Sequence, residues 1–370
     1  MIAGRSNGQN GKPLIGITMG DPLGIGPEVI IKALADPELR SRARYVIFGL
    51  HDVLELAADQ AEISPFWWRE PYDGQPRIFS GVLVADFDDL PAARINGRRE
   101  PDELAGRASL RFVEEGAKHL RSALLDALVT GPICKESWRL ANCRHNGHTD
   151  LLARSFELPH RLVMMFAAGR LRVALASDHI PLFELRHRFT IGLVHRPIDL
   201  LDRALREWFG IPRPHIGVLG LNPHAGEGGL LGDEEQRIIE PALTMARSAD
   251  IHVSGPLPPD TAFTPEVLQR YDGLVAMYHD QGLIPVKMAA FHSAVHLTLG
   301  LPAIRTSPDH GTAFDIAGRN RAHPGSMHAA IALAVHLAER RRENAFAEIQ
   351  RRRDEAQAEA QRRRASAGAD

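Results

Sequence analysis

The sequence predicts an α/β fold, because short apolar segments rich in Val, Ile and Leu alternate with amphipathic segments along its 370 residues. The apolar segments are continuous, which is typical of strands that are buried on both faces of a parallel sheet. Apolar residues make up 44% of the chain and charged residues 24%, as in ordinary globular proteins. The length leaves room for a large core and for two lobes.

Each element is assigned from its own pattern. Strands are predicted over residues 13–19, 45–49, 82–86, 127–130, 162–166, 172–176, 215–220, 274–278 and 295–299. Helices are predicted over residues 28–34, 108–121, 198–209, 233–246 and 328–342, and another is expected to open near residue 148. Pro27 suits a first helical position, and Glu28 suits the first turn, where free backbone N–H groups favour negative charge.

The two ends of the chain differ from the rest. Residues 1–12 are polar and are expected to be flexible. Residues 339–370 form a charged tail with Arg triplets at 340–342, 351–353 and 362–364. Their 11-residue spacing equals three helical turns of about 3.67 residues, so the triplets would share one face. We expect a solvated helix that frays into disorder, with contact to a partner or to nucleic acid as the alternative.

Composition excludes several classes of protein. Lys plus Arg total 44 and Asp plus Glu total 46, so the net charge of −2 argues against a nucleic-acid-binding domain. No uninterrupted apolar run reaches about 18 residues, so no membrane span is expected. Residues 1–12 lack the apolar segment of a secretory signal. The two cysteines, Cys134 and Cys143, fit neither a disulfide framework nor a zinc knuckle. We expect a cytoplasmic protein without nucleic-acid or membrane partners.

A glycine-rich segment, residues 20–28, lies between the first predicted strand and the first predicted helix. It invites comparison with a dinucleotide-binding loop, but Pro27, Glu28 and Val29 follow Gly26, so the third glycine of G-x-G-x-x-G is missing. A Rossmann assignment is therefore excluded. A structural turn and a ligand-binding loop remain equally compatible with the segment.

Three histidines follow predicted strands. They are His179, His224 and His279, each in a polar or glycine-rich segment. Ligands of open α/β sheets gather outside the carboxyl ends of strands, so the three imidazoles could converge. Three neutral imidazoles leave an open position on a divalent metal such as zinc. An ordinary hydrogen-bonded histidine is the alternative at each position.

Basic and hydroxyl side chains occur near the same segments. Arg305 suits bidentate capture of phosphate or carboxylate, and Lys287 offers a point charge. His148 and Thr149 open a predicted helix, where Thr149 could also serve as the N-cap. A solvated surface charge is the alternative for each cation.

The ordered motifs of the chain closely resemble the 4-hydroxythreonine-4-phosphate dehydrogenase family of pyridoxal-phosphate biosynthesis. The resemblance runs from about residue 12 to residue 338. Its motifs lie at residues 20–28, 129–132 with Lys135, 147–149, 221–227, 256–258 with 260–261, 278–282, 298–302, 305–307 and 309–313.

The resemblance implies a two-lobed fold similar to isocitrate and isopropylmalate dehydrogenases, with the active-site cleft between the lobes. The first lobe would comprise residues 13–140 and 313–338, and the second residues 141–312. The family is a homodimer with each active site at the subunit interface, and it binds one divalent metal per subunit. Imidazole ligands favour zinc over magnesium or cobalt.

The resemblance also assigns residue roles. Metal positions match His179, His224 and His279. Substrate positions match His148, Thr149, Lys287, His296 and Arg305, with Lys287 and Arg305 at the phosphate end. Asp260 matches an acidic position near the metal, and Asp260 and Lys287 are the candidate catalytic groups, with a metal-bound water as a further candidate base. No residue is assigned to the nicotinamide cofactor, NAD or NADP.

The implied reaction oxidises 4-phosphooxy-L-threonine to 2-amino-3-oxo-4-phosphooxybutanoate, which decarboxylates to 3-amino-2-oxopropyl phosphate. One departure concerns the substrate, because His296 stands where the family usually carries Asn. The alternative within the enzyme class is a paralogous decarboxylating dehydrogenase for another 3-hydroxy acid, a 4-phospho-threonate or erythronate or a carboxylated cis-dihydrodiol. A regulator that kept the site but lost turnover is the alternative from another class.

Overall fold

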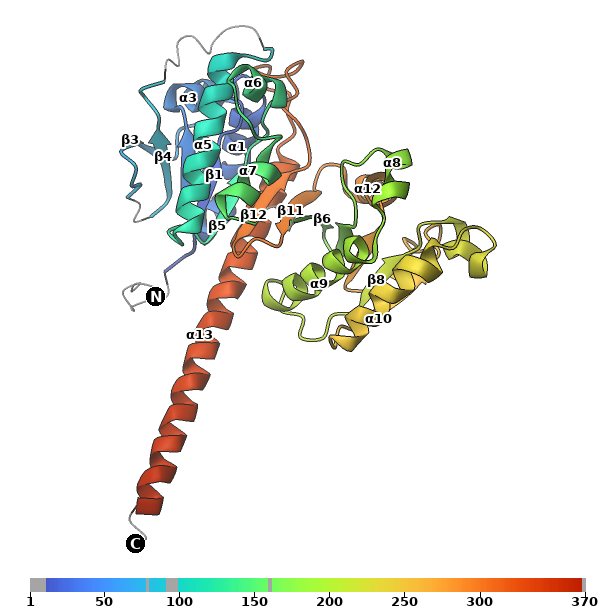
Figure 1. The fold of residues 1–370 in the computed structure, drawn as a ribbon. Helices are drawn as coiled ribbons and strands as arrows, with labels where there is room; N and C mark the ends of the chain where they lie inside the picture. Colours follow the sequence, from blue (N-terminus) through green and yellow to red (C-terminus); the bar gives the residue numbers. More distant parts are fainter. Residues whose placement is uncertain (1–10, 78–79, 91–98, 159–161, 368–370) are drawn as a thin grey trace.

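The described residues of this computed structural model, 11–77, 80–90, 99–158 and 162–367, form an α/β molecule around one mixed sheet of twelve strands (Figure 1). The strand order is β3-β4-β2-β1-β5-β12-β11-β6-β7-β10-β8-β9. We call the strands from β3 to β12 the first half of the sheet, and those from β11 to β9 the second half. The predicted α/β class is confirmed. The predicted flexible segment 1–12 lies, except for residues 11 and 12, outside the described residues.

The strand bounds are β1 Leu14–Thr18, β2 Arg44–Gly49, β3 Trp68–Pro71, β4 Val82–Asp86, β5 Ala127–Thr130, β6 Val163–Ala168, β7 Leu171–Leu175, β8 Ile216–Leu219, β9 Val253–Leu257, β10 Gly273–Ala276, β11 Val295–Leu299 and β12 Ile304–Pro308. All neighbours in the first half pair in parallel. Three successive antiparallel pairings, β12 with β11, β11 with β6 and β6 with β7, then reverse the direction. Consequently β7, β10, β8 and β9, which are parallel to one another, run opposite to the first half.

The helix bounds are α1 Gly26–Leu34, α2 Pro37–Arg42, α3 His51–Gln60, α5 Glu103–Arg121, α6 Lys135–Leu140, α7 His148–Ser155, α8 Leu182–Arg188, α9 Ile191–Glu207, α10 Glu240–Ser248, α11 Pro265–Leu268, α12 His279–Ala290 and α13 Gly325–Ala367. A 3₁₀ segment, Pro223–Gly229, and a π-helical turn, Glu235–Ile239, precede α10. Among the described residues, no helix is long and apolar enough to cross a membrane.

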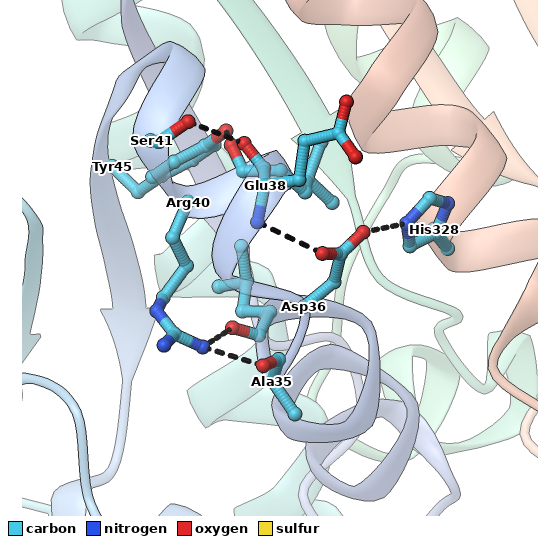
Figure 2. Close-up of polar contacts among 9 residues, drawn as sticks. Ala35, Asp36, Glu38, Arg40, Ser41, Tyr45 and His328 are labelled. Atoms are coloured by element: carbon cyan, nitrogen blue, oxygen red, sulfur yellow. Dashed lines mark hydrogen bonds and ion pairs between the residues drawn. The ribbon is translucent and has the colours of Figure 1, made fainter.

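Helix α13 packs against β12, β5 and β11 and then projects far beyond the body of the molecule (Figure 1). Its buried face includes Ile331 and Val335, which belong to the main apolar core. Near its start, His328 lies 3.0 Å from the carboxylate of Asp36, which also accepts the backbone N–H of Glu38 at the first turn of α2 (Figure 2). These contacts tie the long helix to the α1–α2 junction.

The glycine-rich segment 20–28 is a tightly packed turn. Gly20 has φ of +79°, and a Cβ placed there would lie 2.3 Å from the carbonyl oxygen of Pro132. A Cβ on Gly26 would lie 2.2 Å from the carbonyl oxygen of Met19. Close backbone approach therefore accounts for these two glycines, which favours the structural interpretation of the segment.

Candidate active site

The three candidate metal histidines follow three strands that are adjacent in the second half of the sheet. His179 follows β7, His279 begins α12 directly after β10, and His224 lies in the 3₁₀ segment after β8. The order β7-β10-β8 and the parallel pairing bring the carboxyl ends of these strands to one edge. The segments that carry the histidines therefore start from neighbouring positions.

Two of the three imidazoles lie close together. The ring centroids of His179 and His279 are 5.7 Å apart. The side chain of His224 is 64% exposed, and its Nδ1 lies 3.9 Å from Glu227. Within the part of the chain that the structure describes, ligand atoms of the three histidines do not all come within 4.8 Å of one another; the one set that does is His51, Asp52 and Glu55, on α3.

Carboxylates lie beside two of these imidazoles, and one of them is within hydrogen-bond distance. Nδ1 of His279 lies 2.7 Å from Oδ1 of Asp280, which leaves Nε2 of His279 available to a ligand. Asp178 accepts the backbone N–H of His179 at 2.6 Å, and its other oxygen lies 4.0 Å from Nδ1 of that imidazole. A carboxylate behind an imidazole is a frequent arrangement around protein-bound metals.

Two residues that the sequence reasoning missed hold these segments in place. Glu235, which is 2% exposed, accepts the backbone N–H groups of Leu221 and Asn222 at 2.7 Å each, at the base of the His224 segment. Gln281 donates to the carbonyl of Gly220 at 2.8 Å and accepts the N–H of Met277 at 2.6 Å. Gln281 thus links the segments after β8 and β10. Its place beside His279 in the motif at 278–282 was the available signal.

Arg305 is the centre of a buried polar cluster. It lies on β12 and is 2% exposed. Its guanidinium donates to Nδ1 of His296 at 2.9 Å, to Thr298 at 3.0 Å and to Thr130 at 2.5 Å. Burial lowers the pKa of Arg305 to about 9, so the group remains charged at neutral pH. The partners are all uncharged acceptors.

Strand register explains why these side chains meet. His296 on β11 stands directly opposite Ser307 on β12, and side chains two positions apart on a strand share one face. His296 and Thr298 therefore lie on the same face as Arg305 and Ser307, and Nδ1 of His296 is 3.2 Å from the Ser307 hydroxyl. Sequence reasoning missed the roles of Thr130, Thr298 and Ser307, although the spacing of two from His296 and Arg305 was visible.

Several nitrogen atoms of this cluster have no partner. They are Nε2 of His148, Nε2 of His296 and Nε of Arg305, all buried. Burial, followed by the charge of Arg305, holds the pKa values of His148 and His296 well below the usual range for histidine. Because guanidinium can only donate, Nδ1 of His296 must accept, and the proton of the neutral ring then sits on Nε2. The cluster offers unused donors to an incoming oxygen atom.

Three further candidate residues lie elsewhere in the chain: Lys287, Thr149 and Asp260. Lys287, on α12, has its Nζ 3.0 Å from the carboxylate of Asp309, which follows β12. Thr149 is half-buried in the first turn of α7, and the N-cap is Gly147, so the N-cap alternative for Thr149 is wrong. Asp260 is exposed on the segment after β9. Its role as a catalytic group stays a prediction.

Comparison with known proteins identifies the family to which the chain belongs. A family model described as "Pyridoxal phosphate biosynthetic protein PdxA" matches residues 41–334. A 4-hydroxythreonine-4-phosphate dehydrogenase of Desulforapulum autotrophicum is 43% identical over 329 residues, covering 87% of this chain and 95% of the relative. The chain belongs to the PdxA family.

Solved structures agree with membership of the PdxA family. The 4-hydroxythreonine-4-phosphate dehydrogenase of Klebsiella pneumoniae is 38% identical, has a TM-score of 0.79, and is matched over 89% of this chain and 99% of its own. A terephthalate 1,2-cis-dihydrodiol dehydrogenase of Burkholderia xenovorans is 29% identical, has a TM-score of 0.62, and is matched over 88% and 98%. The PdxA family match ends at residue 334, within α13.

Proposed function

We propose that this chain is an NAD(P)-dependent dehydrogenase that oxidises 4-phosphooxy-L-threonine at its 3-hydroxyl group, in pyridoxal 5'-phosphate biosynthesis. The product, 2-amino-3-oxo-4-phosphooxybutanoate, then decarboxylates to 3-amino-2-oxopropyl phosphate. The observation that carries the proposal is the buried guanidinium of Arg305, which has neutral partners and unused donors around it. A buried cation of this kind is stabilised by an anionic ligand. The curated relatives named for this activity support the same substrate.

The anionic end of the substrate would be held by Arg305 and Lys287. Charge-assisted hydrogen bonds from these groups would anchor it, while His296 and His148 would contribute neutral donors. Thr149 would add a hydroxyl contact from the first turn of α7. This anchoring would fix the carbinol carbon relative to the histidines after β7 and β10. Asp260 and Lys287 remain the candidate groups for proton transfer.

His179, His224 and His279 would hold the divalent metal, with zinc favoured over magnesium or cobalt by three imidazole donors. The closeness of His179 and His279 fits such a site, as does the contact of Asp280 with Nδ1 of His279. When bound, the metal would lower the pKa of a coordinated hydroxyl and stabilise developing negative charge. The nicotinamide cofactor would accept the hydride.

We also propose that the protein acts as a homodimer with its active sites at the interface. Large apolar side chains are exposed beside the candidate metal site: Leu182 and Phe183 on α8, Ile284 and Met288 on α12, Phe291 at the C-cap of α12, and Leu230 after the His224 segment. Ile284 and Met288, four residues apart, lie on the helix that begins at His279, and Phe291 follows its last turn three residues later. A second copy of the chain would cover this surface. It could also complete the metal site, because the three histidines of one chain do not all come within 4.8 Å of one another.

The first experiment measures NADH or NADPH formation at 340 nm with 4-phosphooxy-L-threonine. We expect turnover that is lost after chelation and restored by zinc or another divalent ion. His279→Ala should lose bound metal and activity while keeping its fold. His252 is an exposed histidine just before β9, and His252→Ala should keep both metal and activity. A His279→Ala protein that retains stoichiometric metal would contradict the metal assignment.

A second experiment repeats this assay with a panel of substrates. The panel contains 4-phosphooxy-L-threonine, 4-phospho-threonate, 4-phospho-erythronate and a carboxylated cis-dihydrodiol. The buried His296, with its single free donor, favours testing them, and so does the similarity to the Burkholderia xenovorans enzyme. Turnover of one of these compounds but not of 4-phosphooxy-L-threonine would replace the proposed substrate and keep the reaction class. Tight binding without turnover of any compound would favour a regulator.

A further inference from the structure

Side chains of the α13 segment 339–344 contact both halves of the molecule where the helix leaves the body. We call this segment the clamp. It lies beyond residue 334, where the family match ends. It contains the first Arg triplet, which sequence analysis assigned to a solvated face.

One set of clamp contacts reaches the first half of the sheet and the helix beside it. Glu339 forms an ion pair of 2.7 Å with Arg42, the last residue of α2. Nε of Arg342 lies 3.4 Å from the carboxylate of Asp126, just before β5. Arg341 donates to the carbonyl of Pro302 at 2.9 Å, in the turn that leads into β12. These contacts hold the clamp to the strands that carry Thr130 and Arg305.

A second set of clamp contacts reaches the end of α9. Asn344 donates to the carbonyl of Glu207, the last residue of that helix, at 3.1 Å. Gly210 has φ of +69°, and a Cβ placed there would lie 3.2 Å from the guanidinium of Arg340. Helix α9 packs against β6, β7, β10 and β8 in the second half of the sheet. It therefore supports the strands that precede His179, His224 and His279.

The second Arg triplet has different surroundings. Arg351 and Arg352 form ion pairs with Glu348, on their own helix, at 2.6 Å and 2.8 Å. Their side chains are 67% and 75% exposed. Two triplets of identical sequence on one helix thus differ in what they contact. Position along α13, rather than composition, distinguishes them.

We propose that the clamp is a positioning device for the active site. It holds the end of α9 against the first half of the sheet. It thereby keeps the histidines of the second half at a fixed distance and orientation relative to Arg305. A substrate that reaches from Arg305 to the metal histidines binds best when the two halves already have this arrangement. If clamp loss leaves only a fraction of molecules in that arrangement, the apparent affinity falls by the same fraction. Only the kinetic part of the test below rests on the proposed function, because the deuterium-uptake part needs no substrate.

The test compares two triple variants of the full-length chain. Arg340→Ala/Arg341→Ala/Arg342→Ala removes the clamp arginines, and Arg351→Ala/Arg352→Ala/Arg353→Ala makes the same change one repeat further along the helix. We expect the first variant to raise the KM for 4-phosphooxy-L-threonine about 3- to 10-fold, with kcat within 2-fold of the wild type. Amide deuterium uptake at residues 205–211 should increase. The second variant should match the wild type in all three measurements.

Two chain-shortening variants and one conservative variant complete the test. A chain ending at residue 345 keeps the clamp and should behave as the wild type, whereas a chain ending at residue 338 should behave as the first triple variant. Arg341→Lys retains a donor for Pro302 and should have a lower KM than Arg341→Ala. Equal behaviour of the two triple variants would overturn the proposal. So would a first triple variant that has a lower melting temperature but unchanged KM and unchanged deuterium uptake at residues 205–211.

The failure of the proposed function can be told apart from the failure of this proposal. A wild type that is inactive on 4-phosphooxy-L-threonine would refute the proposed function, while the comparison of deuterium uptake would still decide on the clamp.

Discussion

Arg305 combines a full positive charge with deep burial and neutral partners. Thr130, Thr298 and His296 accept its hydrogen bonds, and burial lowers its pKa to about 9. Taking a charge out of water costs free energy that neutral partners repay only in part. The protein keeps this unfavourable group at the middle of its sheet, which is understandable if an anionic ligand supplies the missing charge.

Replacing Arg305 should separate stability from binding. In Arg305→Met the buried charge disappears, so the free energy of unfolding should be unchanged or higher, by up to about 1–4 kcal/mol. The KM should rise at least about 30-fold, because a charge-assisted anchor worth about 2–3 kcal/mol is lost. Thermal unfolding and steady-state kinetics check the two expectations. Arg172→Met removes a half-buried arginine that stacks on Phe209, and should lower stability with little change in KM. A drop in stability of Arg305→Met without a kinetic effect would contradict the anion pocket.

His296 should contribute to the acid sensitivity of folding. Burial and the nearby charge of Arg305 hold its pKa well below 6.5 in the folded state, whereas the unfolded chain would protonate normally. Below pH 6.5 the unfolded state therefore binds more protons, and stability falls as the pH decreases. The slope of this loss in the range of pH 5 to 6.5 should be smaller in His296→Asn, by at most about 1.4 kcal/mol per pH unit. Urea titrations at several pH values measure it, and an unchanged slope would contradict the neutral buried ring.

The same variant also tests substrate selection. Above pH 6.5 the ring of His296 stays neutral, so its contribution to KM should be constant from about pH 6.5 to 9. Asn at this position offers both a donor and an acceptor, whereas the neutral ring, with Nδ1 engaged by Arg305, offers the donor Nε2–H. We expect His296→Asn to change the relative kcat/KM of the panel by about 1–3 kcal/mol, with metal content unchanged. A flat profile across the panel would show that the side chain does not select among substrates.

At the scale of elements, the His224 segment depends on a single buried carboxylate. His224, Ala225 and Glu227 all have φ between +45° and +54°, a backbone conformation that costs energy for residues other than glycine. Glu235 offsets this cost by accepting the two backbone N–H groups that precede the segment. The loop that carries one candidate metal ligand is thus held by a residue outside it.

Glu235→Ala should loosen the His224 segment. We expect metal affinity to fall about 10- to 100-fold, since outer groups that orient ligands have effects of that size. Isothermal titration with zinc measures this loss. Glu234→Ala is the matched control, because Glu234 bonds the side chain of Asn222 and not the backbone, and it should have a smaller effect. Equal affinities for both variants would mean that Glu235 does not position the segment.

The success of sequence interpretation differed among elements for physical reasons. The nine predicted strands are all present, because buried strands, parallel or antiparallel, leave short runs of mostly apolar residues such as Val82–Asp86. Three strands were missed. β3 is an edge strand with mostly exposed residues, β9 contains Gly255 and Pro256, and β12 contains Arg305, Thr306 and Ser307. The last case is instructive, because the residues that make β12 polar are those that build the buried cluster.

Among the helices and in the site, too, some features were predicted from the sequence and others were missed. The helix predicted over 328–342 is present but continues to Ala367, and α12 was missed, with Pro285 inside it. For the site, the sequence supplied the residue types and their places after strands. It could not supply the pairing of β11 with β12, which puts His296 beside Arg305. Such contacts depend on which strands become neighbours, and no local pattern encodes that.

At the scale of the whole molecule, the exposed apolar side chains of α8 and α12 are the main reason to expect a second copy. Phe183 is 92% exposed and Met288 84% exposed. We predict that Phe183→Glu/Met288→Glu yields a folded monomer with little activity, as measured by light scattering and NADH formation. Phe346→Glu, at an apolar residue of α13 that is 71% exposed, should remain dimeric and active. A double variant that stays dimeric would place the interface elsewhere.

The order of the strands also constrains how the chain is made. Strand β5 ends at Thr130, yet its neighbour on one side is β12, which begins at Ile304. During synthesis, the edge of β5 would stay unpaired until more than 170 further residues had left the ribosome, by the difference between those two positions. Unpaired strand edges invite association with other chains, and pairing across such separations is slow. Nascent chains that stall before β12 should therefore depend strongly on chaperones, whereas loss of the projecting end of α13 should matter little to folding.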